Sequence, residues 1–196
     1  MRKLKLQVQM TIDGFIGGPN GELDWMTWDW DDQLKKYVDD LHKPVDTILL
    51  GRKMADGFIS HWTSVAANPD DEGHAFGKKM IDTPKIVFSK TLDRSEWENT
   101  VIASDLEGDV NGLKNSEGGD IIVYGGADFD RSLIGAGLID EYHLFVNPVA
   151  LGEGLSIFNG LDKARELSLT NSKQYDCGIV VHVYEPKRAE QAQTAT

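Results

Sequence analysis

Apolar and polar side chains alternate along the first regular segment of the chain. Residues 4–10, LKLQVQM, place an apolar side chain at every second position. This period of two predicts a half-buried β-strand. The chain then passes through Asp13-Gly14 into residues 17–28, GGPNGELDWMTW, a turn-rich stretch with two tryptophans. We predict a mobile loop there, of the kind that closes over a ligand.

A helical period replaces this alternation between residues 29 and 42. Apolar side chains at positions 34, 37, 38 and 41 share one side of a helix. Asp29 is placed to cap the helix, and acidic residues in its first turn suit the positive end of the helix dipole. Lys43-Pro44 should end it, because proline disfavours helical backbone at the preceding residue.

Short apolar runs and helical segments alternate through the rest of the chain. Strands are predicted at 46–50, 84–88, 100–102, 121–124 and 141–146. Helices are predicted to begin at Arg52 and to cover 72–81, 105–115 and 129–134, with a polar loop at 63–73. Two extended halves around Asp176-Cys177-Gly178 predict a terminal hairpin. The pattern predicts an α/β fold with a mostly parallel sheet and antiparallel strands at one edge.

The size of the chain fits one globular domain, which we place at residues 1–186, followed by a polar tail at 187–196 that we expect to be disordered. The 32 acidic and 20 basic residues give a formal net charge of -12, which disfavours nucleic acid and anionic membranes as partners. No apolar run approaches the roughly 18 residues of a membrane span, and the N-terminus lacks the apolar core of a secretory signal. We therefore expect a cytoplasmic protein.

Metal binding is not expected. The chain has one cysteine, Cys177, and its five histidines show neither HxxxH nor HxH spacing.

Three predicted strands end in small or basic residues. These ends are Gly51-Arg52-Lys53, Ser89-Lys90 and Gly125-Gly126. The carboxyl ends of parallel strands meet at one edge of a sheet, so the three turns should converge. Helix N-termini offer free N–H groups, and glycine lets a phosphate approach the backbone closely.

Each turn has a plainer interpretation when it is taken alone. A single basic residue is more often a solvated surface charge, and two glycines fit an ordinary turn as well as a phosphate contact. Neither GxGxxG after a strand nor GxxxxGK[ST] is present, and there is no GxSxG elbow. The repetition of basic residues at strand ends favours an anionic ligand.

Five segments together resemble, in order and spacing, the dihydrofolate reductase-like superfamily. They are QMTIDGFIGGPNGELDW, TILLGRKMADGF, KIVFSKTL, IIVYGGADFDRSLIGAGLIDE and FVNPVALGEGLSIF. The resemblance covers roughly residues 3–185 and is closer to the riboflavin-pathway reductase branch, the C-terminal half of bifunctional deaminase-reductases. The zinc signature of the deaminase half is absent, so the chain would carry only the reductase activity. The resemblance implies a three-layer fold, an NADPH cofactor and a homodimer.

The resemblance places NADPH at the three strand ends. The Met54 position departs from the threonine of the family's GR(K/R)T turn, and the two glycines of the third turn are joined in the family by a cis peptide. The cofactor-binding residues that it implies are Ile16, Gly17, Gly51, Arg52, Lys53, Met54, Ser89, Lys90, Gly125, Gly126, Ala127, Asp128 and Phe129. On the substrate side it implies Asp13, Trp25, Phe58 and Asn147, although Trp25 fits a purely packing role equally well.

The catalytic acid is open between two residues. Folate reductases use a carboxylate on the first helix, and counting back from Lys43-Pro44 points to Asp32. Helical phase favours Asp31, which lies three residues before the apolar Leu34. Both carboxylates could instead serve only the helix dipole.

The sequence thus predicts an NADPH-dependent reductase that delivers hydride to a small pterin- or pyrimidine-like molecule. A riboflavin-pathway aminopyrimidine, a phosphoribosylamino-uracil, is the leading substrate. Dihydrofolate reductase proper and a non-catalytic nucleotide-binding module are the alternatives.

Overall fold

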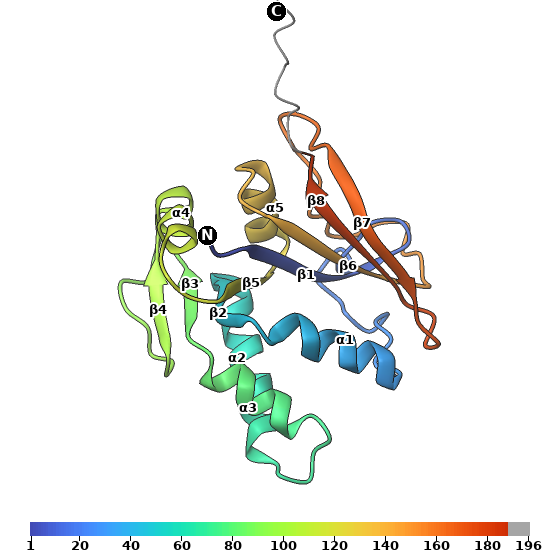
Figure 1. Ribbon diagram of the computed structural model, residues 1–196, viewed down its shortest axis with the longest axis horizontal. Helices are drawn as coiled ribbons and strands as arrows, with labels where there is room; N and C mark the ends of the chain where they lie inside the picture. The colour runs from blue at the N-terminus through green and yellow to red at the C-terminus, as the bar shows by residue number, and fades with distance from the viewer. Residues whose placement is uncertain (188–196) are drawn as a thin grey trace, which may run out of the picture.

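The computed structural model describes residues 1–187 and contains one sheet with helices on both faces (Figure 1). Its strands are β1 (Leu4–Thr11), β2 (Val45–Gly51), β3 (Lys85–Phe88), β4 (Thr100–Ala103), β5 (Asp120–Gly125), β6 (Glu141–Asn147), β7 (Leu167–Gln174) and β8 (Val180–Pro186). Its helices are α1 (Asp32–His42), α2 (Arg52–Ala67), α3 (His74–Asp82), α4 (Leu106–Asn115) and α5 (Ala127–Gly135). The predicted tail falls almost wholly outside the described residues.

The eight strands follow the order β4-β3-β2-β5-β1-β6-β8-β7. The first six are parallel, while β8 runs antiparallel to both β6 and β7. The predicted mostly parallel sheet with an antiparallel edge is therefore confirmed. At the hairpin, the Tyr175 N–H donates to the Ile179 carbonyl at 2.9 Å, and Gly178 has φ +89°, which agrees with the predicted turn.

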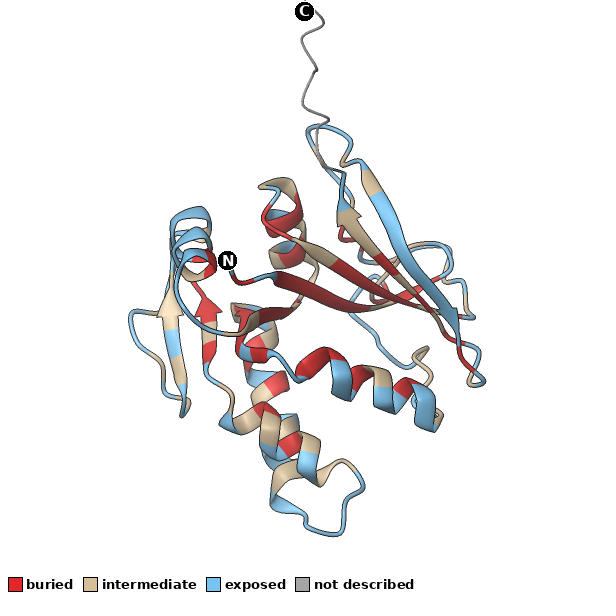
Figure 2. Ribbon diagram, viewed as in Figure 1, coloured by how far each residue is buried: buried red, intermediate tan, exposed pale blue. Residues whose placement is uncertain are grey.

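Three apolar clusters cover the two faces of the sheet, and one of them joins α1 to β6 and β8. The alternating apolar residues of β1 pack with Leu133 and Ile134 of α5 and Val110 of α4. On the other face, α1, α2 and α3 pack against β2, β3 and β5. Figure 2 shows this burial concentrated along the central strands, with β7 largely exposed at the edge. Among residues 1–187, no helix is long and apolar enough to cross a bilayer.

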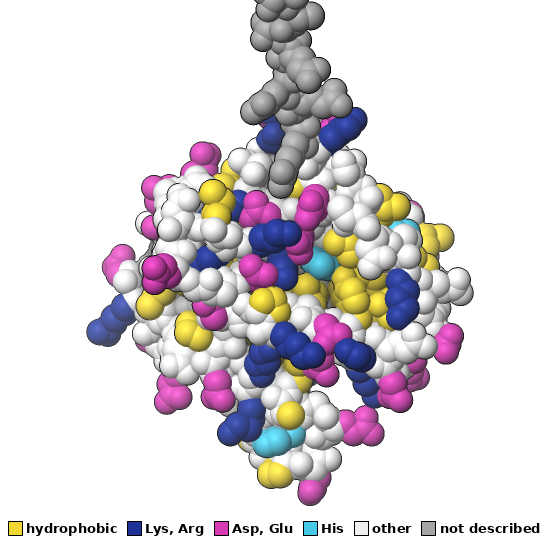
Figure 3. All heavy atoms as spheres, in the orientation of Figure 1, with side chains coloured by type: hydrophobic (Ala, Val, Ile, Leu, Met, Phe, Trp, Pro, Cys, Tyr) yellow, Lys and Arg dark blue, Asp and Glu magenta, His cyan; other side chains and the backbone are white. Residues whose placement is uncertain are grey.

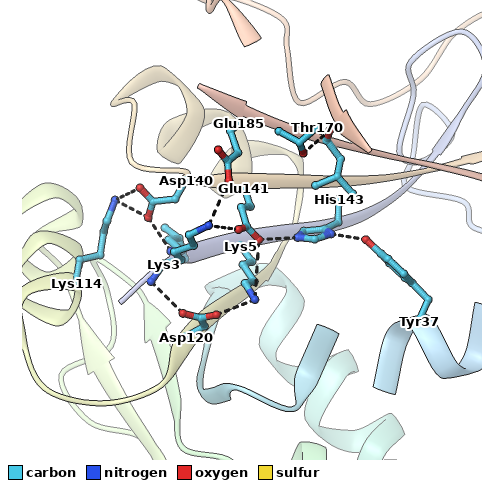
Figure 4. A network of polar contacts seen from close by, with 12 residues as sticks. Lys3, Lys5, Tyr37, Lys114, Asp120, Asp140, Glu141, His143, Thr170 and Glu185 are labelled. Atoms are coloured by element: carbon cyan, nitrogen blue, oxygen red, sulfur yellow. Dashed lines mark hydrogen bonds and ion pairs between the residues drawn. The ribbon is translucent and has the colours of Figure 1, made fainter. Parts of the chain in front are cut away.

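The polar residues of β1 lie on the α1 side of the sheet, where burial demands partners. Lys5 pairs with Asp120 at 2.7 Å, and Glu141 contacts His143 at 3.2 Å. His143 in turn contacts the Tyr37 hydroxyl at 2.6 Å, so the network reaches α1 (Figure 4). The hydrogen bond to His143, together with the nearby lysines, lowers the pKa of Glu141 to about 2 against the effect of burial.

Two predicted boundaries were wrong. Asp31, not Asp29, caps α1, because its side chain accepts the Leu34 N–H at 2.8 Å. The predicted polar loop from residue 63 begins later, because α2 continues to Ala67. That last turn packs on α3, where a Cβ placed on Gly77 would lie 2.9 Å from a Val65 methyl carbon. Packing on α3 therefore stabilises the last turn of α2.

Candidate functional site

The three glycine- and lysine-containing turns converge at the carboxyl edge of the central strands. Gly51 is in register with Phe88, and Leu50 is in register with Gly125. A Cβ placed on Gly51 would lie 2.8 Å from the Phe129 Cβ, and the Phe88 and Phe129 rings are 5.1 Å apart. Only glycine at position 51 allows β2 and α5 to approach this closely. The predicted convergence is confirmed.

The Gly125-Gly126 turn has a conformation that only glycine adopts readily. The φ angles are +56° and +110°, and Gly126 is the N-cap of α5. The expectation of a cis peptide bond between Gly125 and Gly126 was wrong, because no peptide bond of the described residues is cis. In the described part of the chain, no side chain caps α5, and a Cβ on Gly126 would meet only Met54, at 3.8 Å. The turn thus leaves open space beside an uncapped helix N-terminus, where an anion can bind.

Basic side chains flank this turn. Lys53 lies 3.0 Å from the Asp128 carboxylate, and Arg131 contacts the other oxygen of Asp128 at 3.1 Å. Arg52 pairs with Asp56 at 2.7 Å and lies over the Trp97 ring. The hydrogen bond from Lys53 is the main cause that lowers the pKa of Asp128. Two cations around a single carboxylate leave a local positive charge in an acidic chain.

A hollow of about 270 Å³ adjoins the ends of β3 and β4. It is lined by Ser89, Lys90, Leu92, Asp93, Ile102, Ala103 and Ser104. The Ser89 hydroxyl accepts the N–H groups of residues 91 and 92, so it holds the turn, whereas Lys90 is exposed. Ser104 adds a hydroxyl that sequence reasoning missed. The lining thus carries one cation, Lys90, and one carboxylate, Asp93. On the face drawn in Figure 3, acidic and basic side chains are likewise interspersed.

The loop after β1 is fastened to the loop after β6. Asp13 accepts the N–H groups of Gly152 at 2.7 Å and of Leu151 at 3.1 Å, and its hydrogen bonds, the Thr11 hydroxyl first, lower its pKa. The Ile16 N–H donates to the Leu155 carbonyl at 2.8 Å, and Leu155 donates back to Gly17 at 2.9 Å. Asp13, Ile16 and Gly17 thus anchor the start of the predicted mobile loop.

The remaining substrate-side candidates differ in exposure. Trp25 is half-buried, and its indole N–H donates to the Glu22 carbonyl at 3.0 Å. Phe58 is buried against Tyr124, with ring centroids 5.1 Å apart. Asn147 is fully buried and accepts the Thr27 N–H at 3.1 Å, which fastens the far end of the loop. Residues 18–26 lie between these anchors, and the mobility of this segment stays a prediction.

The two candidate acids occupy different environments. One oxygen of Asp31 caps α1 through Leu34, and the other accepts the Cys177 N–H at 3.3 Å. These backbone hydrogen bonds, the one from Leu34 first, lower the pKa of Asp31. Asp32 is exposed in the first turn of α1. The capping interpretation therefore accounts for Asp31, while the catalytic role of Asp32 stays a prediction.

Sequence reasoning missed a third aspartate, Asp130. Its exposed fraction is 0%, and neither carboxyl oxygen has a hydrogen-bond partner among the described residues. Burial raises its pKa to about 7, which the Gly126 N–H opposes without completing a hydrogen bond. Its spacing of three and four residues before Leu133 and Ile134 was the available signal that it faces the core.

Comparisons with known proteins give matches over nearly the whole chain. The RibD C-terminal domain family matches residues 2–181. The uncharacterized protein YyaP of Bacillus subtilis is 36% identical over 183 residues, which cover 93% of this chain and 94% of YyaP.

Two solved structures share the fold. One is a putative riboflavin biosynthesis protein from Shewanella sp. PV-4, with a TM-score of 0.69 and 20% identity over 96% of this chain and 100% of that one. The other is dihydrofolate reductase from Enterococcus faecalis complexed with NADP(H) and RAB-propyl, with a TM-score of 0.57 and 18% identity over 95% and 97% of the two chains. The predicted dihydrofolate reductase-like fold is confirmed.

Proposed function

The chain belongs to the RibD C-terminal domain family, and we propose that it is a cytoplasmic NADPH-dependent reductase of a small pterin- or pyrimidine-like substrate. The observation that carries this proposal is the convergence of three turns, beginning at Gly51, Ser89 and Gly125, at one edge of the sheet. A riboflavin-pathway aminopyrimidine is the leading substrate. As in the sequence-based expectation, we propose a homodimer, which light scattering in solution tests.

The residues present fit a dinucleotide phosphate. The open, uncapped turn at Gly126 suits a pyrophosphate, and Lys53 beside it supplies positive charge. The hollow with Lys90 and Ser104 offers a cation and a hydroxyl to the 2′-phosphate. NADPH, when bound, supplies the hydride. The chain's own residues bind it, orient it and exclude water from the reacting groups.

We assign the candidate substrate-side residues two roles, direct contact with the substrate and support of the surrounding site. Trp25 is half-exposed on the segment between the two loop anchors, so we assign it the substrate contact. Asp13, Phe58 and Asn147 hold the surrounding walls through the contacts described above. Asp32 is the proposed acid because Asp31 is engaged as a cap. Closure of residues 18–26 would shield the site, as loop closure does in many enzymes.

Two substitutions test the cofactor assignment. Lys90→Ala should weaken NADPH about tenfold to about a hundredfold, the range of a charge-assisted hydrogen bond, while NADH loses much less. Lys53→Ala should behave in the same way if it also reaches the 2′-phosphate. Calorimetric titration with both cofactors measures this, and Lys78→Ala, an exposed lysine on α3, is the matched control. Equal losses for both cofactors would reject a 2′-phosphate role.

A dinucleotide-binding module without turnover is the second candidate. The capping role of Asp31 and the burial of Phe58 and Asn147 favour it, because they leave few polar groups free for a substrate. It predicts tight NADPH binding, unchanged in Asp32→Asn, with no oxidation of NADPH across a panel of pterins and pyrimidines. Oxidation with dihydrofolate in the same panel would instead identify a dihydrofolate reductase proper.

A further inference from the structure

The Asp130 carboxyl fills the space that a side chain on Gly125 would occupy. A Cβ placed on Gly125 would lie 1.7 Å from Asp130 Oδ1 and 2.4 Å from Oδ2. Both oxygens are buried without hydrogen-bond partners among residues 1–187, and Asp130 has an exposed fraction of 0%. An unpartnered buried carboxyl is costly, and the cost is smaller when the group is neutral. The carboxyl therefore lies directly behind the turn that offers its open side to a phosphate.

The charged groups beside the turn come from two helices. On α5, Asp128 and Arg131 pair with each other, and from α2 come Arg52, paired with Asp56, and Lys53, paired with Asp128. The helix face that carries Asp130 packs on apolar residues of β1, β2 and β5. Among the described residues, no charged side chain contributes to the raised pKa of Asp130, whose cause is burial. The ionisation of Asp130 therefore depends on its burial and on the charge of a ligand bound at the turn.

We propose that the protonation state of Asp130 controls phosphate binding at the Gly125-Gly126 turn. The turn binds an anionic dinucleotide strongly only while the Asp130 carboxyl is neutral. The inference rests on the proposed function and adds to it a proton linked to binding. An ionised Asp130 would place a second negative charge behind the bound pyrophosphate, in a low-dielectric interior where repulsion is strong.

The direction of the pH dependence follows from this repulsion. A bound anion raises the pKa of Asp130 above its value in the free protein, so binding takes up a proton when Asp130 starts ionised. Affinity is greatest at pH values below the free-protein pKa of about 7 and falls as the pH rises through it. The dissociation constant should rise by up to about tenfold per pH unit until the pKa of the bound state is passed.

NADH is the suitable probe for this linkage. NADPH carries a phosphate monoester that itself titrates near pH 6, whereas the pyrophosphate diester of NADH keeps its charge. We would titrate NADH into the wild-type protein from about pH 6 to about pH 9 by calorimetry, in two buffers of different ionisation enthalpy. The wild-type protein should lose at least about tenfold in affinity over this range and take up protons on binding.

Two variants identify the group responsible. Asp130→Asn keeps the shape of the side chain but cannot ionise, so its NADH affinity should stay nearly constant with pH. Asp40→Asn removes an exposed carboxylate from α1 and should retain the wild-type slope, because the lowered pKa of Asp40 keeps it ionised throughout. The same slope in Asp130→Asn as in the wild-type protein would overturn the inference.

The outcomes separate this inference from the function on which it rests. NADH binding that does not change with pH, without proton uptake, overturns the role of Asp130 alone. Absence of NADH and NADPH binding at every pH overturns the proposed function and this inference with it. If Asp130→Asn does not fold, NMR titration of the Asp130 carboxyl with and without NADH decides. A pKa raised by NADH supports the inference, and an unchanged one refutes it.

Discussion

Gly125→Ala should destabilise the protein well beyond the usual effect of a glycine substitution. Gly125 has φ +56°, a left-handed conformation that costs an L-residue about 1–2 kcal/mol. The added methyl would also lie 1.7 Å from Asp130 Oδ1, in a site with no exposed surface. Overpacking of a buried site adds about 1–3 kcal/mol, so the free energy of unfolding should fall by about 2–5 kcal/mol.

A matched control separates the two contributions. Gly137 has φ +69°, and a Cβ placed there meets nothing within 4 Å. Gly137→Ala should therefore show only the conformational cost, about 1–2 kcal/mol. Urea unfolding monitored by tryptophan fluorescence gives both values by linear extrapolation.

A double-mutant cycle identifies the collision partner. Asp130→Ala removes the carboxyl, and the methyl of Gly125→Ala can then occupy the vacated space. The double variant should be about 1–3 kcal/mol more stable than the sum of the single effects predicts. Additive effects, or a Gly125→Ala variant no less stable than Gly137→Ala, would refute the packing described for this turn.

Three further predictions concern aspartates. The raised pKa of Asp130 means that the folded wild-type protein disfavours the charged carboxyl, so its stability falls as the pH rises from about 4, the unfolded-state pKa, to about 7. Asp130→Asn cannot ionise and should gain at most about 4 kcal/mol over the wild-type protein across this range. Chemical unfolding at several pH values measures the difference. Asp31→Asn should preserve stability and Asp31→Ala should lower it, since asparagine caps helices as well as aspartate does; equal thermal stability of the two variants would contradict the cap. Asp13→Ala should speed hydrogen exchange at the Leu151 and Gly152 amides, whose N–H groups donate to the Asp13 carboxylate. In the wild-type protein these hydrogen bonds should weaken as the pH falls through the lowered pKa of Asp13. Unchanged exchange rates in the variant would contradict these hydrogen bonds.

Local periodicity was enough to predict the strands and their sheet. Alternation in β1 and the short apolar runs of β2, β3 and β5 depend on which faces are buried, a property that the sequence carries directly. The end of α2 was missed because contact of Val65 with α3 stabilises the last turn of the helix. Such contacts depend on residues that are distant in the sequence.

The candidate site was predictable in outline only. Adjacent glycines and basic residues at strand ends predicted where the turns meet, because parallel strands share one carboxyl edge. The lack of hydrogen-bond partners for Asp130 depends on what surrounds it in the folded chain, so no local pattern reveals it. The engagement of Asp31 by Cys177 likewise joins elements far apart in the sequence.

The most direct test of the central claim is calorimetric titration of the purified protein with NADPH, repeated with NADH under the same conditions. The account predicts saturable binding of both cofactors with one site per chain, tighter for NADPH, and a preference that Lys90→Ala removes. No binding of either cofactor, or binding of NADPH unaffected by Lys90→Ala and no tighter than that of NADH, would contradict it.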